Sequence, residues 1–129
     1  MRTAIQTKNA PAAIGPYVQA VKASCGQMVF CSGQIPLDPT SGELIEGGVV
    51  EQTKQVLINL KAVLTAADCQ LSDVVRTTIF LKSMDDFATV NEIYSQTFSE
   101  NPPARACVEV SRLPKDVLVE IDAIAMTSA

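Results

Sequence analysis

Histidine is absent from this 129-residue chain. Its absence excludes Ser-His-Asp triads, Cys-His dyads, histidine-based metal sites and acid–base catalysis by imidazole. Phosphate-binding glycine loops are missing as well, because Gly47-Gly48 lacks the lysine and spacing of a P-loop and no GxGxxG motif occurs. A reaction catalysed by this chain must therefore use arginine, carboxylates, tyrosine, thiols, backbone groups or water.

Runs of basic or apolar residues are also missing. The ten Lys and Arg residues are scattered among fourteen acidic residues, which gives a net charge of −4 and a pI near 4.7. This balance argues against a nucleic-acid partner, whose phosphates favour a basic surface. No stretch approaches the roughly 20 apolar residues that span a bilayer, and the chain shows no apolar signal segment. We expect a cytoplasmic protein with no membrane partner.

The four cysteines form no CxxC pair and no metal-type spacing, so the sequence predicts no metal site. In a reducing compartment they should remain thiols. Cys107 stands apart, because it lies two residues after Arg105 on the same predicted strand face. The other three are expected to be small core residues: Cys25, Cys31 and Cys69.

The hydrophobic pattern, with 47% hydrophobic residues, predicts a single α+β domain over residues 1–129. Helices are predicted over Val49–Ala67, which has a clear apolar stripe, and over Asp86–Phe98, with Asp85 or Asp86 as its cap. Six strands should complete one mixed β-sheet with the two helices packed on one face: Thr3–Gln6, Tyr17–Lys22, Met28–Ser32, Val74–Lys82, Ala104–Val110 and Val117–Met126.

The strands carry apolar residues on both of their faces. Met28 and Phe30 alternate with Val29 and Cys31 in one strand. In Val74–Lys82, we expect one face to consist of Val75, Thr77, Ile79 and Leu81. Two helices can cover only one face of the sheet, and a large exposed apolar patch usually marks an interface. The pattern therefore predicts an oligomer.

The strand that follows Pro102-Pro103 carries the most distinctive pattern. Arg105, Cys107 and Glu109 alternate there with small or apolar residues. An arginine in so apolar a strand could bind a carboxylate or phosphate through two parallel hydrogen bonds. Taken alone, however, the segment favours a structural role, in which Arg105 caps the edge of the sheet or pairs with an acid, because structural ion pairs are common.

Five short motifs follow one another over nearly the whole chain: Ile14-Gly15-Pro16-Tyr17, Cys31-Ser32-Gly33-Gln34-Ile35-Pro36, Asp86-Phe87-Ala88-Thr89-Val90-Asn91, Pro103–Val110 and Leu118-Val119-Glu120-Ile121. In this order they resemble the Rid (reactive intermediate deaminase, formerly YjgF) family, and most closely its RidA subgroup. The resemblance implies a chorismate-mutase-like fold and a homotrimer whose sheets face inward and whose active sites lie between subunits.

The resemblance also implies a 2-iminobutanoate/2-iminopropanoate deaminase, which hydrolyses the imines and enamines released by pyridoxal-phosphate dehydratases to 2-keto acids and ammonia. Arg105 would bind the substrate carboxylate, Glu120 would orient water or move a proton, and Tyr17 would close the pocket. The remaining substrate-binding positions would be Ser32, Gly33, Asn91 and Cys107, the last without covalent catalysis. No cofactor is required, because the substrate is already activated.

Other interpretations remain open for the individual residues. Tyr17 suits an interface, Asn91 suits a bond within its helix, and Glu120 suits a salt bridge to Arg76 or Arg112. The rival function is a trimeric module that binds small keto or amino acids without turning them over. The chain departs from the family pattern at three places. Ala106 replaces a common serine and the segment Ser99–Pro102 is short, so the preferred imine substrate stays open. Asp68 stands where a glycine usually ends the helix, which should matter only locally.

Overall fold

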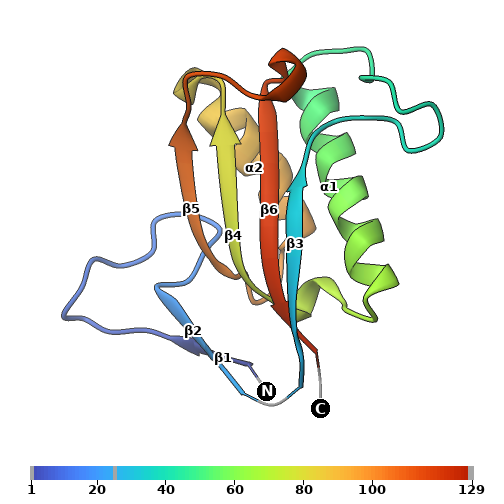
Figure 1. Cartoon of the computed structure of the whole chain (residues 1–129). Coiled ribbons are helices and arrows are strands. Elements are labelled where there is room, and N and C mark those ends of the chain that lie inside the picture. The colour runs from blue at the N-terminus through green and yellow to red at the C-terminus, as the bar shows by residue number, and fades with distance from the viewer. Residues whose placement is uncertain (1, 25, 128–129) are drawn as a thin grey trace.

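The computed structural model describes residues 2–24 and 26–127, and its central element is a four-stranded mixed sheet (Figure 1). The strand order is β3-β6-β4-β5, in which β4 and β5 are parallel and the other neighbours are antiparallel. Both helices cover one face of this sheet, which confirms the predicted α+β fold. The elements are β3 (Met28–Gln34), α1 (Val49–Ala66), β4 (Val74–Leu81), α2 (Phe87–Thr97), β5 (Ala104–Glu109) and β6 (Val119–Met126).

The prediction of one sheet for all six strands was wrong. Strand β1 (Arg2–Ile5) and strand β2 (Ala20–Ala23) pair only with each other and form a separate two-stranded sheet (Figure 1). Gly26 follows them with a φ of 75° and lies against the backbone of Thr127, where no side chain would fit.

Local hydrogen bonds explain where two elements differ from the predicted ranges. Tyr17 donates its N–H to the Gly15 carbonyl at 2.8 Å, so the chain there is a turn and β2 starts only at Ala20. Neither Asp85 nor Asp86 caps α2 through its side chain. Instead, the Ser83 hydroxyl accepts the Asp85 N–H at 3.1 Å and caps a short 3₁₀ turn that leads into the helix.

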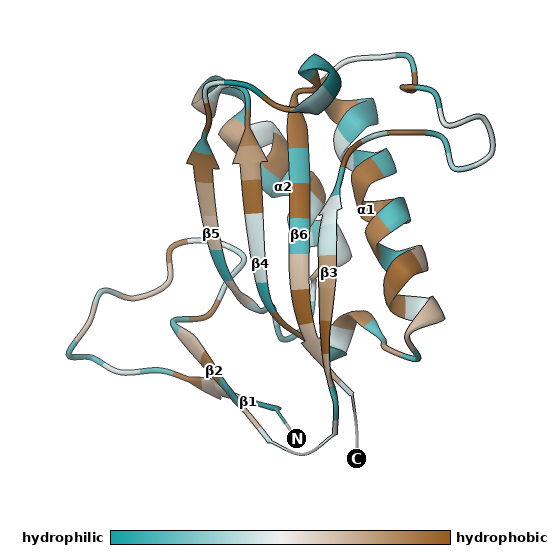
Figure 2. Ribbon diagram, in the orientation of Figure 1, coloured by the Kyte–Doolittle hydropathy of each residue, from teal (hydrophilic) through white to brown (hydrophobic). Residues whose placement is uncertain are grey.

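The core lies between the sheet and both helices. The predicted apolar stripe of α1 includes Val56, Leu60, Val63 and Leu64. Val56, Leu60 and Leu64 are fully buried, whereas Val63 is exposed. Hydropathy colouring shows the alternation of apolar and polar residues along β6 (Figure 2), whose odd-numbered residues Val119–Ala125 are buried against the helices.

A β-bulge corrects the predicted faces of β4. Thr77, Ile79 and Leu81 point into the core as expected, but Val75 does not continue that row. The pairing with β6 shifts between Val74 and Arg76, and Val74 is the residue that is fully buried. The extra residue in the bulge exchanges the faces at the start of the strand, an effect that strict alternation cannot anticipate.

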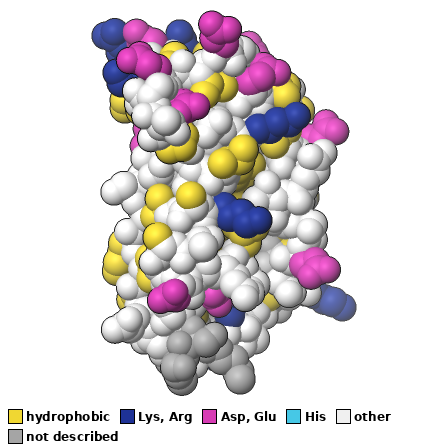
Figure 3. Space-filling model, turned by 90° about the vertical axis from the view of Figure 1, so that its right-hand side faces the viewer, with side chains coloured by type: hydrophobic (Ala, Val, Ile, Leu, Met, Phe, Trp, Pro, Cys, Tyr) yellow, Lys and Arg dark blue, Asp and Glu magenta, His cyan; other side chains and the backbone are white. Residues whose placement is uncertain are grey.

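The second face of the sheet has no helix over it and carries large apolar side chains, as predicted. Phe30 is 69% exposed, Met28 54% and Val108 43%. We call this surface, made by Met28, Phe30, Phe80, Val108 and Ile124, the open face. The side that carries α1 is different, since hydrophobic groups there are interspersed with charged ones (Figure 3). Within the residues that the structure describes, neither helix could span a membrane.

Candidate active site

Arg105 lies on the edge strand β5 and points to the face that the helices cover. It is paired in register with Thr77 of β4, and Cys107 is paired with Ile79, both of which are buried against the helices. Arg105 itself is half-buried. The parallel pairing of β5 with β4 therefore places this guanidinium between the sheet and α2.

An amide and three aromatic rings surround the Arg105 guanidinium. Its Nη1 donates to the Asn91 Oδ1 at 2.5 Å. The guanidinium carbon lies 5.2 Å from the centroid of the Tyr94 ring, 5.3 Å from that of Tyr17 and 5.8 Å from that of Phe87, distances typical of cation–π contacts. We call these five residues the Arg105 cluster. Asn91 is thus bonded to Arg105, not within its own helix.

The loop before β2 brings Tyr17 to this cluster. The Val18 N–H donates to the Pro103 carbonyl at 3.4 Å and ties the loop to the start of β5. The Tyr17 hydroxyl accepts the Ile14 N–H at 3.3 Å. A Cβ atom on Gly15 would lie 3.4 Å from Nη2 of Arg105, so a side chain there would press on the guanidinium. Tyr17 and Arg105 therefore belong to one site within one chain.

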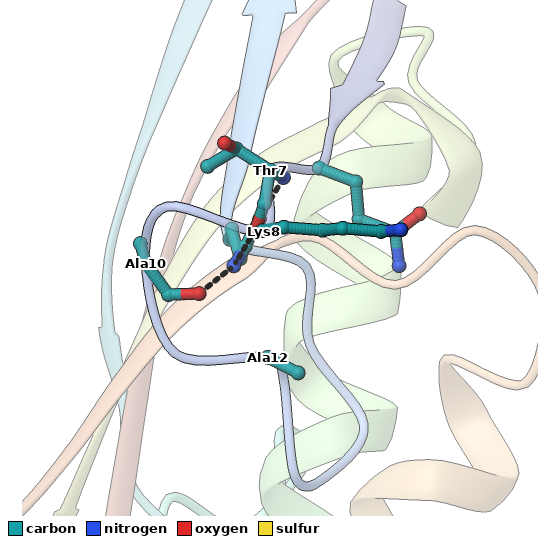
Figure 4. A pocket seen from close by; sticks show the side chains of 6 residues that line it. Thr7, Lys8, Ala10 and Ala12 are labelled. Carbon is teal, nitrogen blue, oxygen red and sulfur yellow. Dashed lines mark hydrogen bonds between the residues drawn. The ribbon is translucent and has the colours of Figure 1, made fainter.

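Further along the same loop, the Gln19 side chain links the end of the loop to its beginning by hydrogen bonds. Its side-chain amide accepts the Thr7 N–H at 2.6 Å and donates to the carbonyls of Thr7, Ala10 and Pro11. These bonds shape an open hollow of about 530 Å³, around which Thr7, Lys8, Ala10 and Ala12 lie (Figure 4). None of the predicted site residues lines this hollow.

Glu120 lies on the opposite face of the sheet. It is paired with Phe80 of β4, one of the residues of the open face. Its carboxylate contacts Gly33 of β3 so closely that a Cβ atom on Gly33 would collide with it. Ser32 precedes Gly33 and has an exposed side chain. We call Ser32, Gly33 and Glu120 the Glu120 cluster.

The Glu120 carboxylate has no hydrogen bond or ion pair within residues 2–24 and 26–127. The predicted alternative was a salt bridge to Arg76 or Arg112, but Arg112 pairs with Asp116 at 2.8 Å and Arg76 is exposed on β4 without an ion pair in the described chain. Partial burial, with a smaller contribution from Asp122 nearby, raises the pKa of Glu120 above its usual value. A carboxyl group with a raised pKa and a free acceptor suits proton transfer.

The two clusters do not meet within one chain. The register pairs Arg105 with Thr77 and Glu120 with Phe80, and these two β4 residues point to opposite faces. The structure thus brings together Tyr17, Asn91, Arg105 and Cys107 on one side, and Ser32, Gly33 and Glu120 on the other.

The three described cysteines have raised thiol pKa values, which disfavours their action as nucleophiles. Partial burial raises the pKa of Cys107, an effect that the nearby Arg105 charge only partly offsets, so the thiol is protonated at neutral pH. This agrees with a binding role for Cys107 without covalent catalysis. Cys31 and Cys69 are buried thiols, as predicted; Cys25 lies outside the described residues.

The sequence interpretation missed the roles of Phe87, Tyr94 and Gly15 around Arg105. None of the three was among the predicted site residues. Tyr94 is fully buried, but its hydroxyl shares a 2.7 Å hydrogen bond with the Thr77 hydroxyl. The available signal was the spacing of Phe87, Asn91 and Tyr94, which places all three on one helix face.

Residues 7–127 match the family described as Endoribonuclease L-PSP. Along 98% of its length the chain is 54% identical to the 2-iminobutanoate/2-iminopropanoate deaminase of Salmonella typhimurium, of which it covers 98%. The chain therefore belongs to the L-PSP family, which includes the Rid and YjgF proteins.

Solved structures agree with this assignment. A Thermotoga maritima protein solved as a candidate endoribonuclease is 50% identical, with a TM-score of 0.78 and complete coverage of both chains. Escherichia coli TdcF, solved with bound serine, is 46% identical and has a TM-score of 0.75; the match covers 98% of this chain and 99% of TdcF.

Proposed function

We propose that this chain is an imine and enamine hydrolase, a 2-iminobutanoate/2-iminopropanoate deaminase that acts in the cytoplasm. The observation that carries the proposal is the half-buried Arg105, which has an amide and three rings around it but no ion pair to a carboxylate in the described chain. Such a guanidinium is suited to a carboxylate ligand. The similarity to the Salmonella deaminase supports the choice of substrate.

To hydrolyse an imine, the protein needs to position the substrate and a water molecule and to transfer protons. Arg105 binds the substrate carboxylate and so fixes the C=N carbon, and Tyr17 closes the pocket beside it. Backbone groups near Cys107 hold the imine nitrogen. Glu120 directs water to the C=N carbon and exchanges a proton with it. The bond from water oxygen to carbon forms, the C–N bond of the resulting carbinolamine breaks, and a 2-keto acid and ammonia leave.

This mechanism requires two neighbouring chains, since Arg105 and Glu120 lie on opposite faces of one sheet. We propose a homotrimer in which the Arg105 cluster of one subunit faces the Glu120 cluster of the next. The apolar open face supplies the physical reason for association, because a surface with Phe30 and Met28 more than half exposed favours burial. Ser32 and Gly33 would then line the pocket from the second subunit.

The second candidate function is a binding module for small keto or amino acids. TdcF was solved with bound serine, itself a carboxylate, and Arg105 alone would serve such a role. Glu120 favours the enzyme, because a free carboxylate beside an anionic ligand does not help binding. Cleavage of RNA, which the family description names, fits poorly with a net charge of −4 and scattered basic residues.

The experiment that tests the proposal follows imine decay. A threonine dehydratase generates 2-iminobutanoate, and the decay of the imine is measured with and without this protein. The deaminase account predicts faster decay in proportion to added protein and no acceleration by Arg105→Ala. Binding of 2-oxobutanoate without any acceleration would favour the binding module, and a matched assay with single-stranded RNA tests for cleavage.

A further inference from the structure

Arg105 is partly buried, yet the described chain gives it no carboxylate partner. The acidic residues of neighbouring elements are engaged or lie elsewhere: the Glu109 carboxylate accepts the Met84 N–H, and Asp122 accepts the Thr78 N–H on the opposite face. The closest polar contact of the guanidinium is the neutral amide of Asn91. Fully buried arginines are almost always paired with an acid, whereas the half-buried Arg105 is surrounded by other groups.

The groups that replace an acid are all electrically neutral. Desolvation by burial raises the pKa of Tyr94 to about 12, so its ring carries no charge at physiological pH. The Thr77 hydroxyl bonds to the Tyr94 hydroxyl at 2.7 Å and fixes the ring in place. The ring faces of Tyr17 and Phe87 and the protonated thiol of Cys107 complete the surroundings.

We propose that Asn91, Tyr94 and Phe87 are positioning residues that hold the Arg105 guanidinium without neutralising it, so that its charge stays available for an anionic ligand. Aromatic faces attract a cation through their quadrupoles, and an amide oxygen accepts a hydrogen bond from one of its N–H groups. Neither cancels the charge as a carboxylate does. The inference rests on the proposed role of Arg105 as the carboxylate-binding group, and it explains how the guanidinium tolerates partial burial beside uncharged groups.

Asn91→Asp is the sharpest test, because it puts a carboxylate of the same size where the amide oxygen now lies. The new acid is ionised at pH 7 and should pair with Arg105. Folding stability should be unchanged or higher, while affinity for 2-oxobutanoate, measured by calorimetry, should fall at least about tenfold. Gln96→Glu is the matched control: it adds the same charge at an exposed position of the same helix and should leave affinity unchanged.

The ring of Tyr94 is tested separately from its hydroxyl. Tyr94→Leu should weaken 2-oxobutanoate binding by roughly 3- to 30-fold, whereas Tyr94→Phe, which keeps the ring, should bind within about twofold of the unmodified protein. Leu60→Ala, a buried change in α1, controls for general destabilisation and should lower the melting temperature without changing affinity.

Calorimetry tests whether the Arg105 charge is available to an anionic ligand, and imine turnover tests the proposed deaminase function. The inference and the proposed function can therefore fail independently. Selective loss of affinity in Asn91→Asp, with Gln96→Glu unaffected, supports the inference even if the protein proves not to hydrolyse imines. Unchanged affinity in a folded Asn91→Asp overturns it, even if the protein is an active deaminase. The uncharged methyl ester of 2-oxobutanoate should not bind; equal binding of the ester and the acid would also overturn it.

Discussion

Arg105→Lys tests the geometry of the guanidinium separately from its charge. Lysine keeps one positive charge but presents it at a point, whereas arginine presents a planar fork that can bind Asn91 and a carboxylate together. The lysine variant should lose one charge-assisted hydrogen bond to the substrate and the cation–π contact that the guanidinium makes with Tyr94. A hydrogen bond to a charged group contributes about 1.5–3 kcal/mol, so kcat/KM should fall roughly 10- to 150-fold.

The assay is hydrolysis of 2-iminobutanoate at several substrate concentrations, with circular dichroism to confirm folding. Arg112→Lys is the matched control, because Arg112 is exposed and pairs only with Asp116 in the described chain; it should leave turnover unchanged. Near-normal kcat/KM in a folded Arg105→Lys would refute the role of the planar fork, and near-normal activity in Arg105→Ala would refute the role of Arg105 altogether.

Four further predictions concern the Glu120 cluster and the open face. Glu120→Gln should slow hydrolysis while leaving 2-oxobutanoate affinity largely intact, and a parallel loss of both would make Glu120 a structural residue. Partial burial raises the folded pKa of Glu120, so the carboxyl group should ionise at a higher pH in the folded protein than in the unfolded chain, and between these two pKa values activity should rise with pH while folding stability falls slightly. A rise in activity that survives in Glu120→Gln would contradict this. Gly33→Ala should displace the Glu120 carboxylate and reduce turnover without loss of Arg105-dependent binding, and wild-type kinetics would disprove the contact. Phe30→Asp should convert a trimer to monomers in sedimentation and abolish turnover, whereas an intact trimer would exclude this surface from the interface.

The periodic spacing of apolar residues predicted most of the fold, because the core is formed by the apolar side of each helix and strand. The α1 stripe and the alternation in β6 follow directly from burying one side of each element. The bulge at Val74–Arg76 and the separate β1–β2 sheet depend on local backbone turns, which a hydrophobic pattern does not encode.

The candidate site, too, was predicted only in part from the sequence. Arg105 stands out in the sequence because an arginine is unusual in so apolar a strand, and the family motifs indicate Tyr17, Asn91 and Glu120. The placement of Arg105 and Glu120 on opposite faces depends on strand register, which the sequence alone did not provide. Tyr94 was missed because a tyrosine in an apolar helix stripe looks like an ordinary core residue until the fold places Arg105 above it.

Mixing two impaired variants tests the central claim, the proposed site shared between neighbouring subunits of a trimer. Arg105→Ala and Glu120→Gln chains are unfolded together, refolded as mixed trimers, and assayed for imine hydrolysis after native mass spectrometry proves mixing. Random assembly at equal amounts should leave about a quarter of the sites with both residues intact, and about a quarter of full activity. Arg105→Ala mixed with Tyr17→Ala is the control, because these residues lie together in one chain and no intact site should form. Recovery in the first mixture alone is the predicted result; no recovery there, despite proven mixing, would contradict the shared site.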